Sequence, residues 1–131
     1  MAGTVTISAA LQVEHAPFSF QWARQASLAQ TGRGMAAALH YVGETPETIN
    51  YGEVLYPGVV VLHNISGFAG GHIVWGVLDG GEFRPVGFLA PGEFAVIRLA
   101  RPGVPPQSVV LQAKAADAGY TAALQPYVFE S

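Results

Sequence analysis

The chain has 131 residues, which is long enough for one domain with its own core and too short for two ordinary ones. It carries a net charge of −3 and contains no cysteine, which excludes disulfides and thiolate metal sites. Because it has no basic block, we expect no nucleic-acid partner. We also expect no membrane span and no secretory signal, since the sequence has no long uncharged apolar run and no basic start before an apolar block.

Charged residues make up 11% of the chain, whereas about 25% is usual for soluble domains. A small monomer exposes much surface for its volume and needs charge to stay dissolved and unassociated. We therefore expect much of this surface to be covered by copies of the chain or by another protein. A monomer with a surface rich in Ser, Thr, Gln and Gly is the alternative.

Alternation of apolar and polar residues begins at once and predicts a half-buried strand in "TVTISAALQV". A second strand follows, in which Phe18, Phe20 and Trp22 alternate with polar residues and are expected to pack in a core. Residues 23–30 fit either a helical turn or a continuation of this strand. The next segment, "TGRG", is expected to form a loop. Residues 35–42 fit a strand or a short helix, and residues 43–53 a loop.

From Val54 onward the sequence predicts β-structure throughout. The continuous run "VVVLH" is typical of a strand buried on both faces. Further strands are expected at 72–78, 83–89, 93–100, 109–113 and 122–129. Asp79-Gly80 suits a tight hairpin turn and Pro91-Gly92 a type II turn. The stretch "VWGVLDGGEFRPVGFLAPGEFAVIRL" is therefore expected to form three successive antiparallel strands.

The predicted elements are about eight to nine short strands separated by turns rich in Gly and Pro, a pattern typical of a sandwich or barrel. No helical segment is long enough for a crossover between parallel strands. No internal repeat or linker divides the chain. We predict an all-β fold: an antiparallel, jelly-roll-like β-sandwich in which residues 1–131 form a single domain.

Histidines and carboxylates form no recognisable catalytic or metal-binding pattern. The histidines lack the spacing of metal pairs, although His63 and His72 flank one Gly-rich loop and would approach each other if it closed a hairpin. Asp79 and Glu82 are expected at a turn, and the glutamates of residues 44–53 in a solvated loop. No nucleophile elbow or phosphate-binding loop is present. We expect no enzyme activity, no cofactor and no metal.

Several side chains are candidates for contact with a partner or ligand. Aromatic residues are numerous enough to line a carbohydrate platform, with Trp75 and Tyr56 as candidates, although core packing is the simpler interpretation. Phe68, in the loop "SGFAGG", is the aromatic residue most expected to touch a partner. The other predicted partner contacts are the loop residues Thr31, Gly32, Arg33 and Gly34. Asn64 begins a glycosylation triplet, to which we assign no role.

A pattern in residues 54–130 consists of an Asn-containing loop after a strand, a "G-x-F-x-P-x-x-x-L-x-P-G-E" hairpin and a "K-A" strand. Its residues are Asn64, Gly81, Phe83, Pro85, Leu89, Pro91, Gly92, Glu93, Lys114 and Ala115. This pattern resembles small β-sandwich structural proteins of tailed bacteriophages and prophages. The resemblance implies a virion component made in the host cytoplasm, either a capsid cement (decoration) protein or a tail protein, with no catalytic residues.

Three functions are therefore considered, in order of preference. The first is a non-enzymatic homo-oligomer, for example a trimer, that docks on phage capsid or tail proteins through "TGRG" and "SGFAGG". The second is a carbohydrate-binding β-sandwich. The third is a small cupin-like enzyme, which the absence of a His-x-His pair disfavours.

Overall fold

The computed structural model describes residues 3–30, 34–99 and 109–130. In these ranges the chain forms eleven strands and no helix, which confirms the predicted all-β class. The described part accordingly contains no helix that could cross a membrane. The strands are β1 (Gly3–His15), β2 (Phe18–Gln30), β3 (Met35–Ala36), β4 (His40–Val42), β5 (Glu47–Thr48), β6 (Pro57–Asn64), β7 (Ile73–Asp79), β8 (Glu82–Leu89), β9 (Phe94–Arg98), β10 (Leu111–Ala115) and β11 (Ala122–Glu130).

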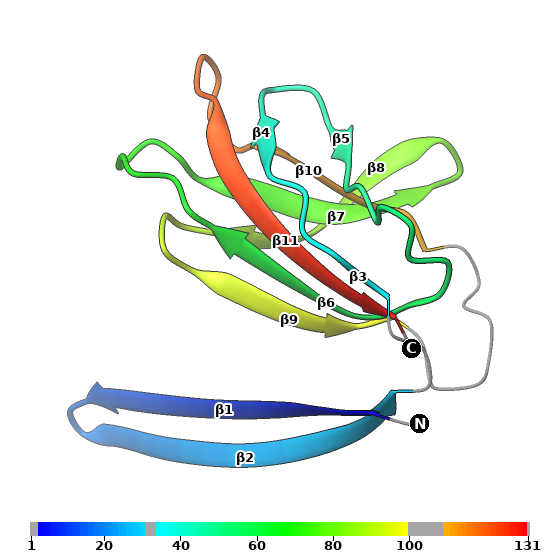
Figure 1. Ribbon diagram of the computed structural model, residues 1–131. Helices are drawn as coiled ribbons and strands as arrows, with labels where there is room; N and C mark the ends of the chain where they lie inside the picture. Colours follow the sequence, from blue (N-terminus) through cyan, green and yellow to red (C-terminus); the bar gives the residue numbers. More distant parts are fainter. Residues whose placement is uncertain (1–2, 31–33, 100–108, 131) are drawn as a thin grey trace.

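Strands β3 to β11 form a sandwich of two antiparallel sheets (Figure 1). One sheet has the order β5-β10-β7-β8, and the other has the order β3-β11-β6-β9 with β4 also on β11. The strands pair as they would in one long antiparallel hairpin that is rolled up around itself. Its successive pairs are β4·β11, β5·β10, β6·β9 and β7·β8. This is the jelly-roll arrangement, so the predicted jelly-roll-like sandwich is confirmed.

The core lies between the two sheets and follows the alternation of side chains along each strand. In β6, Val60 and Leu62 point inward and are fully buried, and in β11 Leu124 and Val128 do the same. Ile73 of β7 faces them from the opposite sheet as part of the same cluster. The "VVVLH" run was expected to be buried on both faces, and most of β6 is buried.

The hairpin between β7 and β8 turns one residue later than predicted. Asp79 pairs with Glu82, so Gly80 and Gly81 are the central residues of the turn, with φ angles of 60° and 79°. Two positive φ angles match the twist of the flanking strands and favour glycine at both positions. The predicted Asp79-Gly80 centre is therefore wrong, because two adjacent glycines form the turn without placing a side chain in the left-handed region.

The turn at Pro91-Gly92 forms as predicted, but it does not join neighbouring strands. Gly92 has a φ of 88°, and the Glu93 N–H donates to the Ala90 carbonyl at 2.9 Å. The chain then crosses to the other sheet, where β9 pairs with β6 rather than with β8. The three strands of this region are confirmed and β7 and β8 are antiparallel neighbours, whereas the expected antiparallel step from β8 to β9 is not a pairing, because β9 pairs with β6.

The segments left open by the sequence are extended. Residues 23–30 continue β2 rather than forming a helical turn. Residues 35–42 form two short strands, β3 and β4, with an irregular stretch between them. The predicted loop that follows contains a two-residue strand, β5, paired with β10.

Asn64 fastens the Gly-rich loop after β6 to the sandwich. Its side chain is 0% exposed. The amide Nδ2 donates to the carbonyls of Gly71 (2.7 Å) and Leu89 (2.9 Å), and Oδ1 accepts from the Ser66 N–H (3.0 Å). Both polar atoms of this buried side chain are therefore hydrogen-bonded. In the folded chain the glycosylation triplet has no accessible acceptor nitrogen.

Replacing Asn64 with Ala is expected to lower the free energy of unfolding by about 3 kcal/mol, because it leaves buried backbone groups without partners. Asn50→Ala is the matched control, since Asn50 is exposed and its side chain accepts from the neighbouring Gly52 N–H. It should cost less than about 1 kcal/mol. Urea unfolding of both variants measures the difference. Equal losses would contradict the role assigned to Asn64.

Candidate protein-interaction surfaces

Strands β1 and β2 form a long hairpin whose two faces differ in chemistry. They pair in continuous register from Gly3 opposite Gln30 to His15 opposite Phe18. Residues directly opposite each other share a face, so the pairs Leu11–Trp22 and Gln12–Gln21 lie on opposite faces. The apolar hairpin face comprises Val5, Ile7, Ala9, Leu11, Val13, Phe18, Phe20, Trp22, Ala26 and Leu28. The other face carries Thr, Ser, Gln and Glu side chains.

The sandwich does not cover the apolar hairpin face. Neither strand of the hairpin pairs with any other described strand, and Figure 1 shows the hairpin as a separate element beside the sandwich. Leu11 is 53% exposed, Phe18 58% and Trp22 42%. The expected half-buried first strand and the expected core position of Phe18, Phe20 and Trp22 are therefore wrong. Alternation determined which side chains share a face, but no second layer lies opposite them.

The hairpin is joined to the sandwich at the end of β11. Gln30 Nε2 donates to the Glu130 carbonyl at 3.0 Å, and the Gly34 N–H donates to Glu130 Oε2 at 2.9 Å. The Glu130 N–H donates in turn to the Gly34 carbonyl. Gly34, a predicted partner contact, is thus engaged within the chain. The predicted contacts Thr31, Gly32 and Arg33 lie outside the described residues.

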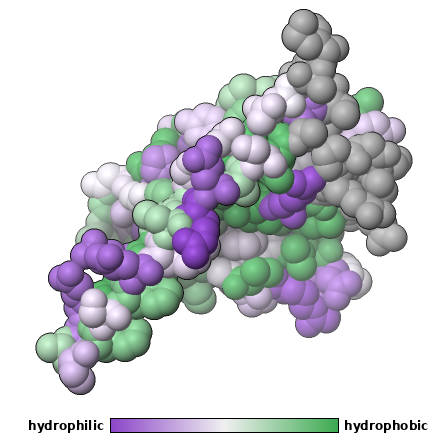
Figure 2. Space-filling model, turned by 90° about the horizontal axis from the view of Figure 1, so that it is seen from below, coloured by the Kyte–Doolittle hydropathy of each residue, from purple (hydrophilic) through white to green (hydrophobic). Residues whose placement is uncertain are grey.

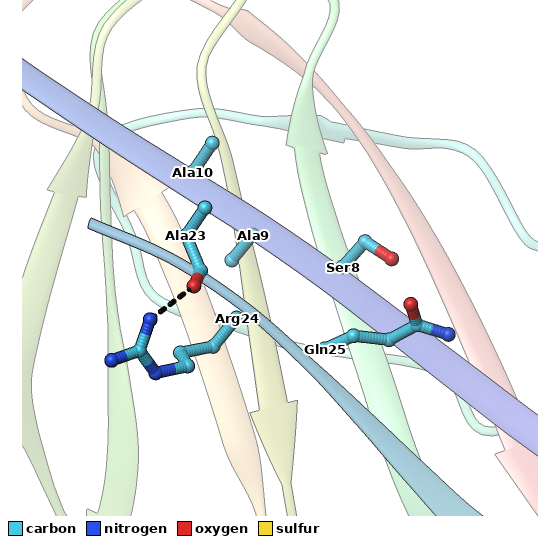
Figure 3. Close-up of a pocket in the computed structure, with 6 residues that line it drawn as sticks. All are labelled: Ser8, Ala9, Ala10, Ala23, Arg24 and Gln25. Atoms are coloured by element: carbon cyan, nitrogen blue, oxygen red, sulfur yellow. Dashed lines mark hydrogen bonds between the residues drawn. The ribbon is translucent and has the colours of Figure 1, made fainter. Parts of the chain in front are cut away.

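Small side chains leave a shallow hollow halfway along the hairpin (Figure 3). Its lining residues are Ser8, Ala9, Ala10, Ala23, Arg24 and Gln25. Arg24 folds back so that its Nη1 donates to the Ala23 carbonyl at 2.6 Å, and its guanidinium carbon lies 5.9 Å from the ring centroid of Trp22. Every lining residue belongs to the hairpin itself, so the hollow is an open surface feature and not a cleft against the sandwich.

A second apolar surface lies on the outer side of the sheet β3-β11-β6-β9. The pairing places Val96 beside Val61 and Val61 beside Tyr127. At one edge Phe94 is 67% exposed, and its ring meets His63 edge-on at 6.4 Å. We call this the outer sheet face; its apolar residues are Met35, Tyr41, Val59, Val61, Phe94, Val96, Ala123, Tyr127 and Phe129, of which Val59 is buried. An outward-facing antiparallel sheet is usually polar, so this surface is unusual.

Seen from below, the surface carries hydrophobic areas that lie between groups of hydrophilic side chains (Figure 2). This agrees with the low charged fraction of the chain. Isolated exposed apolar residues need no explanation, but contiguous patches mark interaction sites.

Phe68 lies in the Gly-rich loop and is 43% exposed. Its ring stacks on that of Tyr120, with centroids 5.9 Å apart and an angle of 25° between the planes. Gly70 makes room for this pair, because a Cβ at that position would lie 2.6 Å from the Tyr120 ring. Phe68 therefore belongs to an exposed two-ring patch that the sequence did not reveal, since Tyr120 is remote along the chain. Its contact with a partner stays a prediction.

The two residues suggested for carbohydrate binding have different surroundings. Trp75 is partly buried and packs against the core from β7. Tyr56 is exposed beside an apolar pocket lined in part by Tyr51, Leu55 and Val109. The Tyr51 hydroxyl donates to the Val109 carbonyl at 2.9 Å, and burial raises the pKa of Tyr51.

One histidine and three carboxylates make hydrogen bonds that brace the described loops. His40 is buried between Glu47, whose Oε1 lies 3.0 Å from Nδ1, and the Asn50 N–H, which donates to Nε2. Glu44 accepts from the Gly119 N–H, and Glu93 from the Ala90 N–H. Glu44 and Glu47 are exposed, as expected for a solvated loop, and each also holds a backbone or side-chain partner.

The metal-binding residues considered from the sequence do not converge in the described part. His63 faces outward from β6, whereas the Nδ1 of His72 is buried without a hydrogen-bond partner among the described residues. No group of three or more His, Asp or Glu side chains in those residues is arranged to hold a metal ion.

Comparison with known proteins identifies no relative of this chain. No family model matches it, and no curated protein or solved structure is significantly similar. The apolar hairpin face, the outer sheet face and the Phe68–Tyr120 patch are the candidate interaction surfaces of the described residues.

Because Trp22 lies outside the core, Trp22→Gln should change the free energy of unfolding of the sandwich by less than about 0.5 kcal/mol. Urea unfolding of dilute protein, followed by the fluorescence of the remaining Trp75, measures this. Leu62→Ala is the comparison and should cost about 3 kcal/mol, since Leu62 is fully buried. A similar loss for both would place Trp22 in the core and contradict the exposed hairpin.

Proposed function

We propose that this chain is a non-enzymatic structural protein that assembles as a homo-oligomer in the virion of a tailed bacteriophage, as a capsid cement (decoration) protein. The single observation that carries the proposal is the apolar hairpin face, which nothing in the described chain covers. The protein would be made in the host cytoplasm and become part of the particle.

The physical reason is the instability of such a hairpin in water. An isolated two-stranded hairpin is at best marginally stable and needs a further strand, sheet or helix against its apolar side. Here each strand has 13 residues, and large aromatic side chains line the exposed side. Aromatic residues are enriched in protein interfaces, where charged residues are depleted. A second protein chain packed on this face would supply the layer that the hairpin lacks, and it would bury the aromatic side chains in an interface.

The virion assignment is supported by the fold and by the resemblance. Jelly rolls are a common architecture of viral capsid domains. Several residues of the resembling pattern occupy defining points of this frame, including Gly81 at the β7–β8 turn, Gly92 at the next turn and Lys114 in β10. These positions in turns and strands support a structural role for the residues of the pattern, and the pattern includes no catalytic residue. Within this class, a tail protein is the alternative to a capsid cement protein.

One observation favours a second candidate, a carbohydrate-binding module. Jelly rolls also occur in lectin domains, and Tyr56 is an exposed ring beside an apolar pocket. Exposed aromatic rings can stack on sugars. This candidate replaces the first one if the natural chain is a monomer that binds a glycan array and loses that binding in Tyr56→Ala.

Assembly is tested by light scattering across a range of protein concentrations. The natural chain should be an oligomer, and Leu11→Gln/Trp22→Gln should raise its dissociation constant at least about tenfold, because loss of two buried apolar contacts costs more than about 1.4 kcal/mol. The matched control is Gln12→Ser/Gln21→Ser, the neighbouring pair on the polar face. It should leave the oligomer intact. A natural chain that is monomeric throughout contradicts the proposal.

The virion assignment has a separate test. Tailed particles released from the source cells and banded on a density gradient should contain this chain in many copies, at a fixed ratio to the major capsid protein, as measured by mass spectrometry. Presence in the lysate with absence from the banded particles would contradict the virion role while leaving assembly unaffected.

A further inference from the structure

We infer that the hairpin of one copy packs with its apolar face on the outer sheet face of a second copy. The inference rests on the proposed homo-oligomer and deepens it by naming both halves of the contact. One half is the face that carries Leu11 and Trp22, and the other is the surface of β3-β11-β6-β9 that carries Val61 and Phe94.

Large parts of both halves are exposed within one copy. Leu11, Phe18 and Trp22 of the apolar hairpin face are exposed, and so are Phe94, Val96 and Met35 of the outer sheet face, whereas Val59 at one end of that face is buried. The hairpin is also longer than the sandwich strands, with 13 residues against 9 in β11. Each copy has one hairpin and one outer sheet face. In a closed assembly, every hairpin can therefore pack on the outer sheet face of a neighbouring copy, and every outer sheet face is covered.

The chemistry of the two faces is compatible. Neither face contributes a carboxylate to the contact, so burial leaves no unpaired negative charge. Arg24 lies on the hairpin face, and its long side chain can keep the guanidinium group in water while its stem packs. Apart from the uncharged amide of Gln125 and the ring of His63 on the outer sheet face, the side chains at its centre are aliphatic and aromatic, which suits sheet-on-sheet packing.

The outer side of the other sheet is a poorer match. It presents Gln112 and Lys114 along β10. At its far edge, Glu82 and Arg84 form an exposed ion pair at 3.0 Å. Phe88 is exposed there as well, but these polar and charged groups interrupt the apolar surface. Packing a hairpin on this sheet would require their desolvation.

The contact area favours reciprocal exchange between copies over a single contact. At about 3.3 Å per residue, β11 is about 30 Å long, and a two-stranded hairpin covers a width of about 10 Å. One such contact removes about 600 Å² of surface in total, less than the roughly 1,200 Å² that stable interfaces require. Two reciprocal contacts reach that size, so one copy both gives and receives a hairpin.

The test uses the absence of cysteine from the natural chain. Single-cysteine variants Ala9→Cys, on the apolar hairpin face, and Gln125→Cys, on the outer sheet face beside His63, are mixed and treated with a short bismaleimide. One variant carries a tag, so that mass identifies the chains that are joined. The expected product is a mixed dimer that is cross-linked between position 9 of one variant and position 125 of the other.

Two matched controls define the faces. Ala10→Cys places the thiol on the polar hairpin face, one residue along the same strand, and Gln112→Cys places it on the opposite sheet. Each control pairing should give several-fold less mixed dimer than Ala9→Cys with Gln125→Cys. Light scattering of each variant confirms that it still assembles as the natural chain does.

The outcomes separate this inference from the proposed function. If the chain assembles but Ala9→Cys couples to Gln112→Cys as well as to Gln125→Cys, the inference is overturned and the homo-oligomer stands. If a double variant Ala9→Cys/Gln125→Cys cross-links only within one chain, the hairpin folds on its own sandwich and the inference is again overturned. If no variant and no natural chain assembles, both fail.

Discussion

Side chains point alternately to the two sides of a β-strand, and this constraint shapes every part of the molecule. In the sandwich it gives each sheet an inner face, from which Leu62 and Leu124 meet side chains of the opposite layer such as Ile73. In the hairpin it gives an equally apolar face with no layer opposite. The same rule therefore produces a sealed core in one place and an open surface in another.

The open surfaces account for the composition. A low charged fraction would be a liability for a monomer that exposed both the apolar hairpin face and the outer sheet face. Covering a large side chain such as Leu11 or Phe20 contributes about 1.5–3 kcal/mol. A few such residues supply enough free energy to offset the ordering of a long hairpin that is only marginally stable alone. In the proposed assembly, covering the hairpin would stabilise the hairpin as well as the contact.

Local patterns in the sequence predicted the strands, the fold class and the turn at Pro91-Gly92, because periodicity and turn chemistry depend on neighbouring residues. They did not predict what covers each strand. Phe18, Phe20 and Trp22 have the pattern of a core strand, and only the tertiary arrangement shows that no second layer faces them. The crossing of β9 to the opposite sheet and the stacking of Phe68 on Tyr120 likewise depend on contacts remote in sequence.

The central claim is that another protein chain covers the hairpin, and hydrogen exchange of the natural protein tests it most directly. Backbone amides of β1 and β2 should exchange slowly at concentrations where the chain is assembled, and much faster after dilution to the monomer. Amides of the sandwich strands β6 and β11 should stay protected in both states. Hairpin amides that exchange equally fast at every concentration would contradict the account, because they would show a hairpin that nothing covers.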